Sequence, residues 1–166
     1  MKKFVFLLSI VCLFAMSAFA QTPSFAGDWK LDTSKLDERR AAMIESQTMK
    51  VEQTDKEIKS TTTIVQKAGA QTNGRGMGPG GTNTYKLDGS EVVTERDTPN
   101  GKVSIKTTTK LNGNKLEISN TFPGPNGDVT NKTTWELSAD GKTLTVKSTR
   151  MTPNGEVTIE SVYNKS

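Results

Sequence analysis

Two arginines occupy matching places in a repeated segment of this chain. Arg96 and Arg150 each precede a Pro-Asn-Gly triplet by three residues, and segments 96–105 and 150–159 repeat one another almost residue for residue. A guanidinium group presents a planar set of donors that binds a carboxylate or phosphate bidentately. Facing inward at equivalent heights, the two arginines could hold an anionic head group. Alternatively, their side chains extend to solvent from the strand ends.

Residue types that commonly carry catalysis are scarce. The sequence has no histidine and a single cysteine, Cys12. Histidine triads, thiol nucleophiles and the usual zinc ligand sets are therefore not available to the domain that follows. Most acidic residues fall at predicted turns or on the solvent side, so no inward carboxylate pair is expected. We predict no catalytic residue, no metal site and no cofactor, with an unusual carboxylate enzyme as the remaining alternative.

The N-terminus has the pattern of an export signal. Lys2 and Lys3 precede an apolar run over 4–16, and residues 18–20 read Ala-Phe-Ala. Small residues at these two alanine positions are what a signal peptidase recognises. We predict a signal peptide over 1–20, cleaved near Ala20, and a secreted or periplasmic protein. The bulky residue before Cys12 argues against a lipid anchor.

The remaining domain, 21–166, contains no cysteine, so it cannot rely on disulfides. Removing Lys2 and Lys3 from the 22 basic residues leaves 20 against 18 acidic ones, and no basic run exceeds two residues. This balance argues against a nucleic-acid partner. About 146 residues suffice for one domain, which we expect to be a monomer.

Turn-forming sequences divide this domain into short runs of alternating apolar and polar residues. Asn-Gly or Asp-Gly between such runs is a strong hairpin signal, because a type I′ turn needs positive φ at both central residues. These turns are the triplets beginning at Pro99, Pro125 and Pro153 and the pairs beginning at Asp88, Asn112 and Asp140. The pattern predicts an all-β, up-and-down antiparallel meander of about ten strands, over 27–31, 47–53, 57–66, 82–87, 91–97, 102–111, 114–122, 128–138, 142–151 and 156–164.

Strand register follows from the predicted two-residue turns. The expected opposing pairs are Tyr85 with Val92, Arg96 with Ile105, Thr107 with Ile118, Asn120 with Thr133, Trp135 with Val146, and Arg150 with Ile159. This register places the apolar positions on one face and Lys, Glu and Thr on the other. An outer face of this kind excludes a membrane barrel, which needs an apolar outer band. We expect the sheet to curl into a closed barrel, which would remove its unpaired edges.

A short helix is expected between the first two strands. Ser34 can cap a helix that begins near Leu36, with Asp37 and Glu38 in its first turn. Its apolar stripe is too short for a core helix.

Both ends of the domain resemble the fatty-acid-binding proteins, a family of lipocalin-like (calycin) barrels. Residues 25–31, Phe-Ala-Gly-Asp-Trp-Lys-Leu, resemble the opening Phe-x-Gly-x-Trp-Lys-Leu of that family, and residues 162–165 resemble its closing strand. The resemblance implies a ten-stranded barrel that binds a ligand inside. The family usually binds the ligand carboxylate with Arg-x-Tyr on the last strand. Here Ser161 occupies the arginine position, which leaves Tyr163.

The two ends of the predicted barrel differ in chemistry. The Asp-Gly end collects large apolar residues, including Trp29 and Trp135, and is expected to be a packed floor. The other end is expected to be an open mouth near the glycine-rich segment 73–81, which is best explained as a loop. The candidate ligand-binding residues are Arg96, Arg150, Asn120, Asn131, Phe122 and Tyr163. Between the two ends, the hydroxyl groups of inward threonines and serines favour a cavity that holds water.

Two functions remain open. The first is a secreted lipocalin-like protein that binds a small hydrophobic or amphiphilic ligand in the barrel lumen. The alternative is a non-catalytic interaction or structural barrel of the cell envelope whose lumen is filled by side chains.

Overall fold

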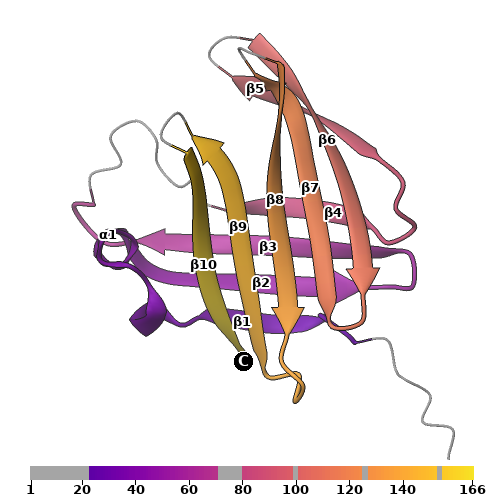
Figure 1. The fold of residues 1–166 in the computed structure, drawn as a ribbon. Coiled ribbons are helices and arrows are strands. Elements are labelled where there is room, and N and C mark those ends of the chain that lie inside the picture. The colour runs from indigo at the N-terminus through magenta and orange to yellow at the C-terminus, as the bar shows by residue number, and fades with distance from the viewer. Residues whose placement is uncertain (1–22, 71–79, 99–100, 125–126, 153–154) are drawn as a thin grey trace, which may run out of the picture.

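The protein is a nearly closed β-barrel (Figure 1). The computed structural model describes residues 23–70, 80–98, 101–124, 127–152 and 155–166. Its elements are β1 (Gly27–Leu31), η1 (Thr33–Lys35), α1 (Glu38–Met43), β2 (Ile44–Gln53), β3 (Glu57–Gln66), β4 (Gly80–Lys86), β5 (Val92–Thr98), β6 (Gly101–Asn112), β7 (Lys115–Gly124), β8 (Gly127–Leu137), β9 (Thr143–Thr152) and β10 (Gly155–Lys165). The prediction of a ten-stranded antiparallel meander with one short helix after the first strand is confirmed.

All ten strands belong to one sheet, in the order β4-β3-β2-β1-β10-β9-β8-β7-β6-β5. The first and last strands of the chain pair with each other, since Leu31 of β1 lies opposite Tyr163 of β10. In Figure 1, β1–β3 run from side to side and β6–β10 run between top and bottom. The two parts of the curled sheet therefore face each other. This curling brings the apolar face inside without any covering layer of helices.

The barrel does not close between β4 and β5, because these two strands are the ends of the sheet. The predicted pairing of Tyr85 with Val92 is therefore wrong. The Asp88-Gly89 pair does form a turn, in which Asp88 Oδ1 accepts the Ser90 backbone N–H at 2.9 Å. Instead of entering a ladder with β5, however, the end of β4 bonds elsewhere: Leu87 N donates to Lys56 O, and the Thr109 hydroxyl on β6 donates to Lys86 O.

Strand register differs from the prediction at four hairpin pairs and matches at Trp135 opposite Val146. The observed pairs are Arg96 with Val103, Thr107 with Asn120, Asn120 with Asn131, and Arg150 with Val157. At the Pro-Asn-Gly sites the glycine is already the first residue of the returning strand, since Thr98 pairs with Gly101 and Thr152 with Gly155. The predicted turn residues Asn100, Asn126 and Asn154 lie outside the described residues.

Each of these register errors amounts to two residues, and side chains alternate faces with a period of two. The side chains of these four hairpin pairs consequently stay on their predicted faces. Leu116, Ile118, Trp135, Leu137 and Leu144 are all buried, as the pattern required.

The core lies at one end of the barrel, the predicted floor. Trp29 is fully buried and donates from Nε1 to the Phe25 carbonyl at 2.9 Å. Trp135 packs against the rings of Phe25 and Tyr85, with centroid separations of 6.2 and 5.7 Å. Toward the opposite end the inward residues are less covered, as Val157 shows with 38% exposure.

The helix caps differ from the prediction. Asp37, not Ser34, caps α1, and its Oδ1 accepts the Arg40 backbone N–H at 3.0 Å. Ser34 instead lies within η1, which Asp32 caps by accepting the Ser34 N–H. Aspartate is favoured at both cap positions, because its short side chain accepts a hydrogen bond from an N–H group that has no partner within the helix.

Candidate functional site

A cavity of about 420 Å³ lies inside the barrel against the unpaired edge of β5. It contains four of the six residues that the sequence predicts for a ligand site: Arg96 on β5, Asn120 and Phe122 on β7, and Asn131 on β8. They converge because each has inward parity on neighbouring strands of the curved sheet.

Two of the three asparagines that line this cavity, Asn120 and Asn131, face each other directly across β7 and β8. Thr107 Oγ1 donates to Asn120 Oδ1 at 2.8 Å. This bond occupies the acceptor end of the Asn120 amide and turns its nitrogen, a two-proton donor, away from Thr107. The cavity therefore offers side-chain N–H donors to a ligand with acceptor atoms.

Arg96 is the one charged residue among the described residues that line the cavity, and none of them is acidic. Its guanidinium carries five donors and no acceptor. The local electrostatics thus favour an anionic ligand over a cationic one. Because the Arg96 side chain is exposed, solvent screening reduces the strength of its interaction with an anion.

The other wall of the cavity is apolar. Val92, Ile105 and Phe122 contribute aliphatic and aromatic surface, and Tyr85 extends from the floor. Burial raises the pKa of the Tyr85 phenol, an effect partly offset by its hydrogen bond with Ser60, so this group is neutral at physiological pH. A polar side beside an apolar side suits an amphiphile.

Arg150 does not line this cavity. It lies on β9, four strands from Arg96 in the sheet order, a path of about 19 Å along the sheet at the usual strand spacing. Its side chain is exposed. Equivalent positions in the repeat give the two arginines similar heights but place them on separate parts of the wall. The structure does not assemble the predicted two-arginine clamp.

Tyr163 also lies outside the cavity and belongs to the buried core, with 4% of its surface exposed. Its hydroxyl accepts a 2.6 Å hydrogen bond from Gln47 Nε2 on β2. Burial raises the Tyr163 pKa to about 12, while the nearby Arg40 and the Gln47 bond act in the opposite direction. The phenol is therefore a neutral, bonded part of the interior.

An arginine from α1 reaches the same region. Arg40 donates from Nη2 to Ser161 Oγ and from Nη1 to Glu160 O, both at 2.8 Å. Ser161 occupies the position where the fatty-acid-binding proteins usually have arginine. The Arg40 guanidinium from α1 contacts it there. Sequence reasoning missed Arg40 and Gln47 because only the folded chain brings α1 and β2 beside β10.

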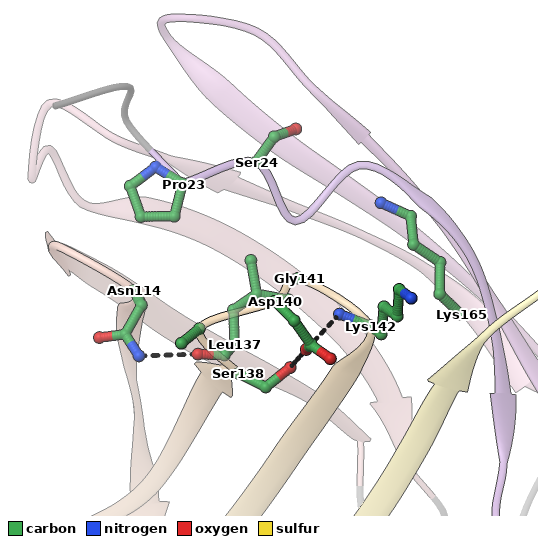
Figure 2. A pocket seen from close by; sticks show the side chains of 10 residues that line it. Pro23, Ser24, Asn114, Leu137, Ser138, Asp140, Gly141, Lys142 and Lys165 are labelled. Atoms are coloured by element: carbon green, nitrogen blue, oxygen red, sulfur yellow. Dashed lines mark hydrogen bonds between the residues drawn. The ribbon is translucent and has the colours of Figure 1, made fainter. Parts of the chain in front are cut away.

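A second hollow, of about 760 Å³, lies outside the floor (Figure 2). Pro23, Lys165 and the turn between β8 and β9 line it. Figure 2 shows that its polar groups bond one another: Asn114 donates to Leu137 O at 2.7 Å, and Ser138 Oγ and Lys142 N both donate to Asp140 Oδ1. These bonds, led by the Ser138 hydroxyl, lower the pKa of Asp140. The Asp140 bonds stabilise the turn between β8 and β9, and the Asn114 bond joins the β6–β7 turn to the end of β8.

Among the described residues, no group of three or more His, Cys, Asp or Glu is arranged to hold a metal ion. Within the same residues, no helix is long and apolar enough to cross a bilayer. Segment 73–79 of the glycine-rich loop and the predicted signal peptide lie outside the described residues.

Comparisons with known proteins support the fold. No protein-family model matches the sequence, and no curated protein does. Among solved structures, the chain is similar to zebrafish ileal bile acid-binding protein in complex with cholic acid, with a TM-score of 0.51 and 18% sequence identity. The match covers 86% of this chain and 98% of the zebrafish chain. The protein thus has a lipocalin-like barrel in the layout of the fatty-acid-binding proteins.

Proposed function

We propose that this protein binds a small anionic amphiphile in the barrel lumen. The observation that carries the proposal is the cavity in which Arg96 and two asparagine amides face an apolar wall, with no acidic residue among the described lining. The apolar part of the ligand would lie on Ile105 and Phe122 and its anionic end beside Arg96. The zebrafish protein of similar fold is complexed with cholic acid, which agrees with a ligand of this class.

We further propose that the protein is exported and acts without catalysing a reaction. The N-terminal pattern around Lys2, Lys3 and residues 18–20 supports export. The lack of histidine in the sequence supports a binding role, since the commonest general base is missing.

The competing account is a barrel with a filled lumen that acts through its outer surface. A fluorescent titration separates the two, with a dansyl-labelled fatty acid and its methyl ester as probes. A binding protein is expected to take up the acid about tenfold more tightly than the ester, the scale of one charged hydrogen bond at a partly exposed site. Saturable binding of neither probe would contradict lumen binding of this class. Native mass spectrometry of the protein from its own host would then show whether any small molecule is carried.

A further inference from the structure

The unpaired junction of the barrel is part of the ligand cavity. We call this junction the seam: residues 82–85 of β4 and 92–96 of β5. Four consecutive β4 residues line the cavity, Thr82, Asn83, Thr84 and Tyr85. Because successive strand residues point to opposite faces, all four can line it only if the strand edge itself does. The backbone edge of β4, which no ladder pairs with β5, thus borders the cavity, whereas β5 contributes its inward residues Val92, Thr94 and Arg96.

The seam is open to solvent on its inner side as well. Asn83, Thr94 and Arg96 have inward parity, yet all three are exposed. Inward residues that line the same cavity from the paired strands β6–β8 are half-buried, as Ile105, Asn120 and Asn131 show. The greater exposure on β4 and β5 indicates that solvent reaches the cavity between these two strands.

The opening is confined to the upper part of the seam. Near the floor, the Thr109 hydroxyl on β6 donates to Lys86 O at the end of β4, and Leu87 N donates to Lys56 O. Tyr85 packs there against Trp135. The Thr109 bond holds β4 against β6 below the cavity, and the other two contacts join β4 to the β2–β3 turn and to β8.

The α1 side of the barrel has the opposite character. Arg40 joins α1 to β10 through its bonds to Glu160 O and Ser161 Oγ. The Gln47 bond to Tyr163 lies in the same region, and Lys67 N donates to Met43 O at the end of α1. A ligand passing between α1 and β10 would therefore have to break the Arg40 hydrogen bonds.

We propose that the seam is the entrance of the ligand site: the ligand passes between β4 and β5, and its anionic end stays in the seam beside Arg96. The β4 edge has no ladder partner at the cavity, so backbone N–H groups that point from this edge would add donors for the same acceptor atoms. This inference rests on the proposed lumen binding and adds where the ligand enters and which end remains outermost.

The test compares two neighbouring positions of β5 that face opposite ways. Thr94 lines the cavity, whereas Val93 has the outward parity and is 56% exposed. Thr94→Cys and Val93→Cys are made with Cys12→Ser, modified with a bulky methanethiosulfonate, and mixed with the dansyl fatty acid in a stopped-flow instrument. We expect modification at 94 to slow association by about tenfold or more, and modification at 93 to leave it within about twofold. Dithiothreitol should restore the rate, which excludes misfolding as the cause.

The outcomes separate this inference from the proposed function. Unmodified variants that bind no probe would overturn both. Unmodified variants that bind, with an association rate insensitive to the group at 94, would overturn the seam entrance alone. Arg40→Ala provides a second arm: an unchanged association rate agrees with the seam, whereas a severalfold faster rate would place the entrance at α1.

Discussion

Thr107 on β6 donates a 2.8 Å hydrogen bond from its hydroxyl to the Oδ1 atom of Asn120, the residue directly opposite on β7. The bond fixes the orientation of the Asn120 amide, and Asn131 faces it from β8. A row of polar side chains therefore crosses three strands at the level of Arg96's cavity.

Asn120→Asp should weaken binding of the dansyl fatty acid by about tenfold or more. The substitution puts a carboxylate of the same shape into a cavity whose described lining has no acidic residue, and this carboxylate would repel the anionic end of the ligand. Binding of the methyl ester should change far less. Asn112→Asp makes the same chemical change at the exposed end of β6 and serves as the control. Equal affinity of the acid for the wild type and the Asn120→Asp variant would show that the ligand lies elsewhere.

Trp135→Ala should lower the free energy of unfolding by about 3–5 kcal/mol, as other large-to-small core changes do. Trp135 is 4% exposed and contacts the rings of Phe25 and Tyr85, so its removal leaves a void in the floor. Denaturant unfolding measures the change, with Met151→Ala, at a 60% exposed side chain, as the control. A Trp135→Ala midpoint equal to that of the wild type is incompatible with a packed floor.

Gly127→Val should destabilise the protein by about 1–2 kcal/mol. Gly127 has a φ of +111°, which L side chains rarely adopt, although an added Cβ would meet no atom within 4 Å. The cost is thus expected from backbone strain alone. Gly81→Val is the matched control, since its site also has open space but no positive φ. Thermal unfolding of the two variants should differ, and equal melting temperatures would refute the strain.

Alkaline pH should destabilise the protein through Tyr163. Burial raises its pKa from 10.0 to about 12 in the folded state, so between these values the folded protein keeps a proton that the unfolded chain releases. Below pH 10, Tyr163 is protonated in both the folded and the unfolded state, so its titration does not change the free energy of unfolding. As the pH rises toward 12, the free energy of unfolding falls by up to about 3 kcal/mol. Unfolding measured across this range should show a shallower decline for Tyr163→Phe. An equal decline in both proteins would mean that Tyr163 titrates normally.

The sequence predicts the faces of the strands better than their exact partners. The Pro-Asn-Gly glycines have positive φ, as expected, but they belong to the returning strands, which moves Arg96 from Ile105 to Val103. Local turn signals do not distinguish these registers. Burial depends only on parity, and an error of two residues preserves parity.

The features that the sequence does not predict are all non-local. The seam depends on where the curled sheet meets itself, and the turn signal at Asp88-Gly89 gives no indication that β4 and β5 separate there. The contact of Arg40 with Ser161 joins residues 121 positions apart. Four of the predicted site residues still meet in one cavity, because inward parity and height along the strands are readable from the turns.

The most direct test of lumen binding is the affinity of the dansyl fatty acid for Arg96→Ala and Arg150→Ala. The two arginines occupy the same place in the repeat, and both are exposed, but only Arg96 lines the cavity. Arg96→Ala should weaken binding by about tenfold, the scale of a charged hydrogen bond reduced by solvent screening, while Arg150→Ala leaves it nearly unchanged. Equal losses in both variants, or no loss in either, would contradict a ligand whose anionic end lies beside Arg96.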